Sequence, residues 1–374
     1  LLGPAVALAT DWPQYRGPTT DGISPDPLST NWPANGPTVV WTNMSLTNGF
    51  SSFAVNQGRA FTLISRTIGE QLMEVCVAVD AATGTNIWAS PVGTAPGDSP
   101  DSVGNGGDGT SPYNTGDGPR STPAVTDTNV IVLSGHLVLA SLNVKNGSTN
   151  WIRDLKTLYG ASEVGIGWNN AASPRLDNDL IFVNLNTSTN NQTLYAFRAT
   201  DGSWAWRSQN EKLTHTTPVV ATILGTQQVL FATVTGIVSL DRNTGALLWK
   251  YTYPWGSIAT SMGASPVVYS NILFCTAGYN KGSAAVRISY TNSSWMTNQL
   301  WKQTYPDTTY QSIWMTPVVY QGYLYGQFAN GSYLTCPLNC LELASGSLMW
   351  STPNFGKGGT ILVNSSLVER KVQR

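Results

Sequence analysis

The chain has 374 residues, of which 41% are hydrophobic and 11% are charged, and its formal net charge is −1 at pH 7. A nearly neutral chain has no basic footprint, which argues against nucleic acid as a partner. The sequence contains no run of 18 apolar residues, so no transmembrane helix is expected. It holds 36 glycines and 14 tryptophans, and sustained helical periodicity is absent, which favours one long all-β domain.

The chain opens with LLGPAVALATDW, an apolar stretch that carries small residues at Ala7 and Ala9. This spacing is typical of the cleavage site of a secretory signal, so residues 1–10 are interpreted as the remnant of a signal peptide. An ordinary apolar N-terminal strand is the alternative. The first interpretation predicts an exported protein, periplasmic or extracellular, whose residues 11–374 form one domain.

Five segments share one frame, in which a polar residue is followed by a glycine and then, four residues later, by a tryptophan. They are DAATGTNIW (80–88), NVKNGSTNW (143–151), RATDGSWAW (198–206), DRNTGALLW (241–249) and ELASGSLMW (342–350). An Asp or Asn at the start can accept backbone N–H bonds and begin a turn. Glycine supplies the positive φ of a tight, bulged hairpin. The frame therefore predicts a hairpin whose return strand carries a tryptophan that fills the space between packed sheets.

A second element recurs between the frames, a short Ser/Thr-Pro segment that opens an apolar strand. Its copies begin at Ser51, Ser121, Ala172, Thr216, Ala264 and Met315, with a seventh opening at GGT (358–360). Proline is confined to strand starts and edges, so each copy marks the first strand of a sheet. Each complete unit then reads as four antiparallel strands, and units of this size repeating at such intervals are typical of propeller blades.

The repeat tryptophans set the number of blades. They are Trp41, Trp88, Trp151, Trp206, Trp249, Trp301 and Trp350, separated by 43 to 63 residues. Seven tryptophans and seven openings predict a seven-bladed β-propeller of four-stranded antiparallel blades. Trp41 precedes the first opening, so it is assigned to the last blade, whose sheet an N-terminal strand would complete and thereby cover an exposed edge. Only LVERKVQR follows GGTILVNSS, so the last blade is expected to be incomplete or the chain truncated.

Three further stretches carry a family resemblance: DWPQYRGPTTDGIS (11–24), GDGPRSTPAV (116–125) and NFGKGGTILV (354–363). Together with the repeats, they resemble the exported bacterial PQQ-like β-propeller repeat proteins. That family is related to the lipoprotein scaffold of the outer-membrane assembly machine and, more distantly, to quinoprotein alcohol dehydrogenases. The resemblance implies the fold and export, but it leaves the function open because one fold hosts many functions.

The resemblance raises pyrroloquinoline quinone (PQQ) as a cofactor, and the sequence argues against it. Quinoprotein dehydrogenases as a family have eight blades, an adjacent pair of cysteines above the cofactor, and an Asp base beside a Ca²⁺ site. The four cysteines here are Cys76, Cys275, Cys336 and Cys340, none adjacent, and no haem-attachment motif occurs. Cys76 and Cys275 are interpreted as buried small hydrophobes. No organic cofactor is therefore expected.

Calcium is the one candidate cofactor, at a glycine-rich insertion that spans residues 97–118. Asp98, Asp101 and Asp108 are its candidate ligands, because carboxylate oxygens on a flexible loop suit Ca²⁺. The spacing does not match an EF-hand, and a plain polar loop is the alternative. Only two histidines occur, His136 and His215, and they form no zinc-binding motif. The sequence also lacks a glycine loop of the kind that binds phosphate.

Residues just ahead of the strand openings are predicted to gather round one mouth of the central channel. The candidate ligand-binding ring is Phe50, Arg120, Trp168, Asn169, His215, Gln311, Trp314 and Lys357. Aromatic platforms with nearby amides suit a sugar or an extended peptide, and Arg120 could hold a carboxylate or sulfate through its planar fork. Alternatively, Trp168 and Trp314 pack between blades and Arg120 holds the N-terminal arm.

Two classes of function follow. The first is an exported, non-catalytic binding or scaffold propeller that engages protein or polysaccharide at the channel mouth. Such a protein is expected to bind no nucleic acid and to be a monomer. The second is an enzyme at the same mouth, either a PQQ-dependent oxidoreductase or a polysaccharide-cleaving propeller. An enzyme needs an acid/base pair within reach of the substrate proton. The ring offers His215, Lys357 and Arg120 without a carboxylate, so the sequence favours binding.

Overall fold

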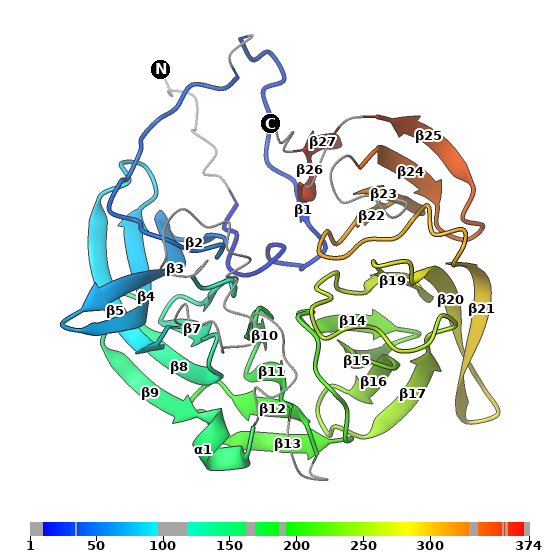
Figure 1. Cartoon of the computed structure of the whole chain (residues 1–374), viewed down its shortest axis with the longest axis horizontal. Helices are drawn as coiled ribbons and strands as arrows, with labels where there is room; N and C mark the ends of the chain where they lie inside the picture. Colours follow the sequence, from blue (N-terminus) through cyan, green and yellow to red (C-terminus); the bar gives the residue numbers. More distant parts are fainter. Residues whose placement is uncertain are drawn as a thin grey trace, which may run out of the picture.

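A computed structural model describes residues 10–33, 36–95, 118–161, 169–186, 192–328, 336–353, 355 and 358–369. Its strands form seven sheets arranged in a ring around a central axis (Figure 1). Within the described residues, six sheets have four antiparallel strands in chain order, and the seventh has three. The predicted all-β, seven-bladed propeller is confirmed. No described helix is long and apolar enough to cross a membrane.

The first three sheets are formed by consecutive strands, listed from the channel outward. Sheet one has β2 (Ala54–Asn56), β3 (Arg59–Ile68), β4 (Gln71–Asp80) and β5 (Asn86–Thr94). Sheet two has β6 (Ala124–Val125), β7 (Asn129–Leu133), β8 (Val138–Asn143) and β9 (Thr149–Asp154). Sheet three has β10 (Arg175–Asp177), β11 (Leu180–Asn184), β12 (Leu194–Arg198) and β13 (Trp204–Ser208).

The next three sheets repeat this arrangement. Sheet four has β14 (Val219–Ile223), β15 (Thr226–Ala232), β16 (Gly236–Asp241) and β17 (Leu247–Thr252). Sheet five has β18 (Val267–Tyr269), β19 (Ile272–Ala277), β20 (Gly282–Thr291) and β21 (Ser294–Thr304). Sheet six has β22 (Val318–Tyr320), β23 (Tyr323–Gln327), β24 (Leu338–Glu342) and β25 (Leu348–Thr352). Each first strand begins within a predicted opening, so the openings are confirmed as the inner strands.

The seventh sheet differs from the prediction in how the N-terminal segment joins it. It consists of β1 (Ile23–Ser24), β26 (Thr360–Val363) and β27 (Ser366–Glu369), in that order. β1 pairs in parallel with the inner edge of β26, with Ile23 opposite Leu362. An N-terminal strand therefore joins the last blade as predicted, but it is Ile23–Ser24 and not the segment that ends at Trp41. Residues 37–41 form no strand, because no described strand lies beyond β27 for them to pair with.

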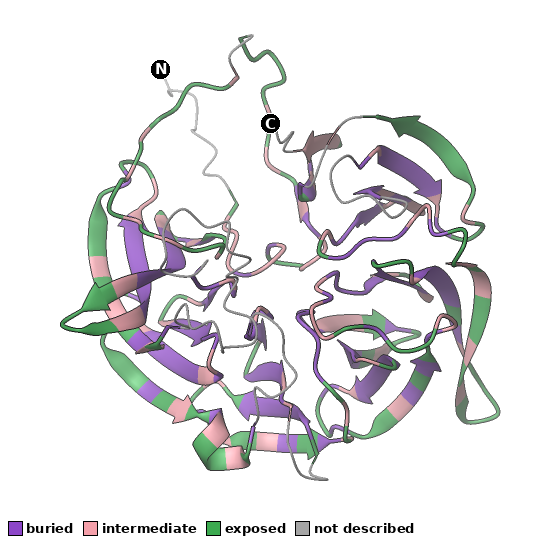
Figure 2. Cartoon of the chain, viewed as in Figure 1, coloured by how far each residue is buried: buried purple, intermediate pink, exposed green. Residues whose placement is uncertain are grey.

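The core lies between the sheets, where the second and third strands of neighbouring blades pack face to face. Figure 2 shows these second and third strands mostly buried, whereas most fourth strands, at the outside of the ring, are exposed on one face. Between sheets three and four, for example, Phe182 and Leu194 pack with Val229 and Phe231, all less than 2% exposed. Burial of each such side chain stabilises the fold by about 1.5–3 kcal/mol, so the ring is held mainly by apolar contacts between blades.

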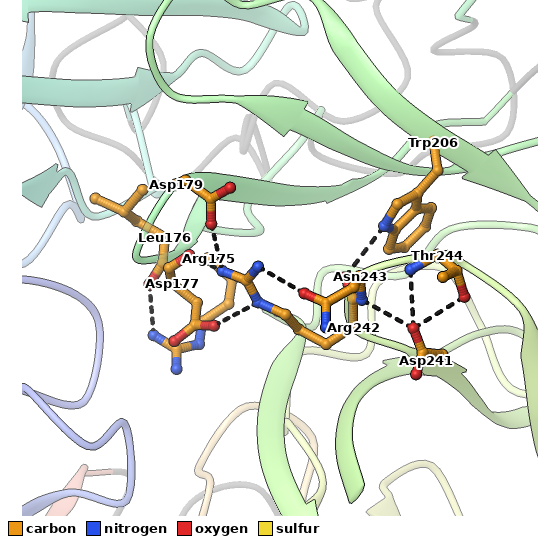
Figure 3. Close-up of polar contacts among 9 residues, drawn as sticks. All are labelled: Arg175, Leu176, Asp177, Asp179, Trp206, Asp241, Arg242, Asn243 and Thr244. Atoms are coloured by element: carbon orange, nitrogen blue, oxygen red, sulfur yellow. Dashed lines mark hydrogen bonds and ion pairs between the residues drawn. The ribbon is translucent and has the colours of Figure 1, made fainter.

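The repeated frame links each blade to the one before it, as Figure 3 shows for sheets three and four. Asp241 accepts hydrogen bonds from the backbone N–H groups of Asn243 and Thr244, which forms the turn. The indole of Trp206 packs on that turn, and its Nε1 donates to the carbonyl of Arg242 at 3.1 Å. Gly245 has a φ of +72°, and a Cβ there would lie 2.6 Å from the indole ring. We call this contact of a tryptophan with the next blade's glycine turn the latch.

Four more latches have the same geometry. The indole donors and their carbonyl acceptors are Trp41 to Ala81, Trp88 to Val144, Trp151 to Ala199 and Trp301 to Leu343, at 2.8 to 3.1 Å. In each, a Cβ on the frame glycine of the receiving turn would lie 2.4 to 2.7 Å from a heavy atom of the blade before it. The glycine of the frame is therefore required twice, for its positive φ and for the space that the indole occupies.

Trp249 departs from this pattern. The hairpin that follows it, between β20 and β21, turns through Asn292 and Ser293 and lacks the frame. The Trp249 indole instead donates to Oε1 of Gln228, a fully buried residue of its own sheet, at 2.8 Å. A polar side chain from within the blade thus satisfies the indole where the neighbouring turn offers no carbonyl.

An ion-pair cluster adds to the latch between sheets three and four (Figure 3). The guanidinium of Arg242 lies 2.8 Å from the carboxylate of Asp177 and 2.9 Å from that of Asp179. The hydrogen bond from Arg242 holds the pKa of Asp179 below its ordinary value.

The one described helix, α1 (Leu155–Tyr159), follows β9 and is capped at its C-terminal end by Gly160.

Substitution of a latch glycine tests whether the indole contact stabilises the ring. Gly245→Ala introduces both a strained φ and a clash with Trp206, whereas Gly225→Ala introduces only the strain, because its φ is +81° and its Cβ position is open. Gly245→Ala should lower the free energy of unfolding by about 1–3 kcal/mol more than Gly225→Ala does. Urea denaturation measures both variants, and equal losses would show that the indole contact adds nothing.

Candidate functional site

The N-terminal arm, residues 11–24, lies along the central channel (Figure 1). Trp12 exchanges two backbone hydrogen bonds with Val55 of β2, at 2.9 and 2.8 Å. The carbonyl of Pro13 accepts from the amide of Val125 in β6 at 2.7 Å. The arm then reaches β22 and returns beside β26. It therefore contacts the inner strands of blades on opposite sides of the ring.

Arg16 fixes the middle of the arm. Its guanidinium donates to the carbonyls of Thr316 at 2.9 Å and Pro317 at 2.8 Å, at the start of β22. It also donates to the carbonyls of Thr20 and Asp21 within the arm, at 3.4 and 2.6 Å. Burial lowers the pKa of Arg16, but an arginine stays protonated in proteins, so one cation holds the arm's turn against blade six.

The strand openings at this mouth are joined by hydrogen bonds between blades. The amide of Thr122 donates to Oγ of Ser173, and the amide of Ser173 donates to Oγ1 of Thr217, at 2.9 and 3.0 Å. The amide of Ser265 donates to Oγ1 of Thr316 at 2.9 Å. The Ser or Thr before each proline therefore links its blade to the next. The segments that predicted the strand starts therefore also connect neighbouring blades at the mouth of the channel.

The structure describes six of the eight residues of the predicted ring. Trp168, Lys357 and the candidate calcium ligands Asp98, Asp101 and Asp108 lie outside the described residues. Asn169, His215 and Gln311 are buried, whereas Phe50 and Trp314 are 65% and 48% exposed. The described part of the chain contains no cluster of three His, Cys, Asp or Glu residues that could hold a metal. The ring as a ligand site remains a prediction.

The described ring residues meet in small groups, each from neighbouring blades. The guanidinium carbon of Arg120 lies 5.7 Å from the centroid of the Phe50 ring, a cation–π arrangement. Nδ2 of Asn169 lies 3.4 Å from Nδ1 of His136. A Cβ at Gly263 would lie 3.5 Å from Trp314 and 3.9 Å from His215, so both residues lie close to this glycine. Phe50 and Trp314 in these groups offer exposed aromatic surface at the mouth.

Arg16 is the residue at the mouth that sequence reasoning missed. It belongs to the WPQYRG stretch, which supported the family resemblance and was considered as the arm that Arg120 would hold, not as the source of the holding residue. The available signal was a lone arginine in an arm with few other charges.

All four cysteines are free and buried, as expected for Cys76 and Cys275. Burial raises the pKa of the Cys76 and Cys275 thiols.

The arginine that holds the arm can be tested by a substitution that keeps its charge. Arg16→Lys replaces five planar donors with a compact ammonium that cannot reach the same four carbonyls. The free energy of unfolding should fall by about 2 kcal/mol, and the arm should become a site of limited proteolysis. The control Arg198→Lys alters an exposed arginine that bonds Trp204, and it should change stability by less than about 0.5 kcal/mol. Equal stability of the two variants would contradict the role of Arg16.

Comparisons with known proteins agree with this architecture. The family model described as "Outer membrane protein assembly factor BamB" matches residues 72–352. A curated relative, the outer membrane protein assembly factor BamB of Moranella endobia strain PCIT, is 24% identical over 254 residues, which cover 66% of this chain. The match covers 60% of the length of that relative.

Two solved structures share the fold. BamB from Moraxella catarrhalis superimposes with a TM-score of 0.54 at 15% identity, over 83% of this chain and 76% of its own. The quinohemoprotein alcohol dehydrogenase from Comamonas testosteroni gives a TM-score of 0.62 at 12% identity, over 95% of this chain and 69% of its own. Because the family model covers most of the repeats, this chain belongs to the BamB-type family of PQQ-like β-propeller proteins.

Proposed function

We propose that the chain is an exported, non-catalytic scaffold propeller that binds protein through the loops at its channel mouth. The occupied channel is the observation that carries this proposal. Arg16 directs its guanidinium to four backbone carbonyls of the protein itself, and Trp12 is paired with β2. A ligand that approaches this mouth therefore contacts the arm and the surrounding loops before it can enter the central channel.

The family supports protein as the class of partner. The curated relative and the matching family model are both named outer membrane protein assembly factor BamB. We therefore propose a partner from outer-membrane protein assembly, and a location on the periplasmic side of that membrane. The small residues Ala7 and Ala9 in the apolar stretch LLGPAVALA, which suit a signal-peptide cleavage site, support export. Exposed aromatic side chains are the residues that most often dominate protein interfaces, so Trp314 is the proposed anchor.

The dehydrogenase neighbours raise PQQ again, and the channel residues do not fit that group. Tyr15, Arg16 and Thr20 of the arm line the same small pocket as Thr217 and Ser265, which lie just ahead of the inner strands β14 and β18. A planar tricyclic quinone on the axis would have to displace the arm and leave the carbonyls of Thr316 and Pro317 without their donor. For this reason the proposal includes neither PQQ nor a redox reaction.

Binding of an unfolded outer-membrane protein tests the proposed function. A fluorescently labelled outer-membrane β-barrel protein, diluted from urea, should bind the purified chain in an anisotropy titration. Trp314→Ala should weaken this binding by about tenfold or more, as loss of an anchoring tryptophan does. The matched control Trp204→Ala removes a tryptophan of similar exposure on the outer strand β13, and it should leave the affinity unchanged.

The alternatives make distinct predictions in a thermal-shift measurement, because a ligand that binds only the folded state raises its melting temperature. PQQ with Ca²⁺ should leave the melting temperature unchanged. A rise would contradict the proposal and make the chain a candidate oxidoreductase. A rise with a polysaccharide that is lost in Trp314→Ala would replace the protein partner with a sugar.

A further inference from the structure

The turn that Trp88 latches differs from the other latched turns in the residue before its glycine. In the turns of sheets one and four this residue is Thr83 or Thr244, and its hydroxyl donates to the Asp that begins the turn, at 3.0 and 2.9 Å. In sheet two it is Asn146, which is exposed. The segment NVKNGSTNW therefore places an Asn–Gly pair inside a latch.

An Asn–Gly pair can rearrange without an enzyme. The backbone nitrogen of the glycine attacks Cγ of the asparagine, and the new C–N bond closes a succinimide ring. The side-chain nitrogen leaves as ammonia and takes with it the proton of the attacking amide. Water then opens the ring at either carbonyl, which gives aspartate or isoaspartate. Glycine favours ring closure because it has no Cβ to obstruct the approach and its backbone adopts many conformations.

The closed turn withholds both reacting groups. The Gly147 amide donates to the carbonyl of Asn143 at 2.9 Å, and Oδ1 of Asn146 accepts from the amide of Ser148 at 3.0 Å. Gly147 is buried under the Trp88 indole, where a Cβ would lie 2.6 Å from the ring. Because these contacts fix the peptide plane of Gly147, its nitrogen can turn toward Cγ only when the turn opens.

Two further bonds tie the turn to sheet one. Nε1 of Trp88 donates to the carbonyl of Val144 at 3.1 Å, and Oγ of Ser90 donates to the carbonyl of Gly147 at 2.7 Å. Both donors belong to β5, the outer strand of the neighbouring blade. The turn therefore opens only when the two blades separate at this point, which is a local opening of the kind that hydrogen exchange detects.

We propose that Asn146 is a modification site at which isoaspartate forms when the latch between sheets one and two opens. In isoaspartate the main chain runs through the side-chain carbon, so the backbone between residues 146 and 147 gains one carbon atom. Gly147 then no longer fits under the Trp88 indole while the turn keeps its hydrogen bonds. The site thus converts a transient separation of two blades into a permanent one.

The rate of the reaction tests control by the latch. The purified chain is aged at mildly alkaline pH, and tandem mass spectrometry then distinguishes isoaspartyl from aspartyl products. Trp88→Phe keeps an aromatic ring but removes the indole donor, and it should speed the loss of ammonia at Asn146 by about threefold to tenfold.

The pair Asn48–Gly49 is the internal control, since its glycine lies against Leu63 and Pro119 and not under an indole. Its rate should be the same in both proteins. An unchanged rate at Asn146 in Trp88→Phe would overturn the proposal. Equal acceleration at Asn48 and Asn146 would also overturn it, because the opening would then not belong to the latch.

Two variants of Asn146 test the effect of the product on the latch. Asn146→Thr introduces the residue that sheets one and four have at this position and should abolish the product. Asn146→Asp carries the charge of the product on a normal backbone. That charge is compatible with a latch, because Asp201 stands before Gly202 in the turn that Trp151 latches at 3.0 Å.

Exchange of the Trp88 indole N–H with D₂O is the readout. It should be at least about tenfold faster in aged protein rich in isoaspartate than in fresh protein, and it should stay slow in Asn146→Asp. Equal exchange in aged and fresh protein would overturn the permanent opening. Fast exchange in Asn146→Asp would contradict the role of the extra backbone atom.

Discussion

The ring depends on the contact between a tryptophan indole and the glycine turn of the following blade. Apolar packing holds neighbouring sheets together, but it does not by itself specify how far one sheet is rotated against the next. The latch does, because the indole donates to one carbonyl and fits only where the turn has no Cβ, as Trp206 does at Arg242 and Gly245. Repetition of that contact round the ring keeps the sheets in one radial arrangement, and the inner strands then enclose a channel.

The channel in turn explains the position of the N-terminal arm. Inner strands such as β2 and β6 have an edge that faces the axis, and the arm pairs with those edges through Trp12 and Pro13. Arg16 satisfies carbonyls at the start of β22 that would otherwise face the channel. The consequence for function is that the axis is filled by the chain itself. The mouth loops and the blade edges are left as the surfaces through which a scaffold protein can bind.

The repeated phrases in the sequence predicted the architecture well, because each part of the frame has a definite physical role. Asp241 forms a turn, Gly245 turns the backbone and makes space, and Trp249 returns on the last strand. The seven openings, five of which contain proline, likewise placed the inner strands. These signals are local, so they can be read from one stretch of chain at a time.

The failures concern contacts between distant residues. The closing strand was placed at the segment before Trp41 because that tryptophan matches the frame, whereas Ile23 pairs with Leu362. No local sequence pattern predicts a parallel strand pairing that is only two residues long. Arg16 was missed for the same reason, since its partners Thr316 and Pro317 lie some 300 positions away. Within the predicted ring Arg120 lies over Phe50, but the burial of His215 and Gln311 could not be foreseen from sequence.

Exchange of the indole N–H protons tests the central role of the latch most directly. Trp→Phe substitutions assign the indole signals of ¹⁵N-labelled protein, and transfer to D₂O then reports how often each latch opens. The account predicts slow exchange for Trp41, Trp88, Trp151, Trp206 and Trp301, whose indoles are bonded to carbonyls, and fast exchange for Trp350. Exchange of Trp206 as fast as that of Trp350 would show that the latch does not hold the blades together.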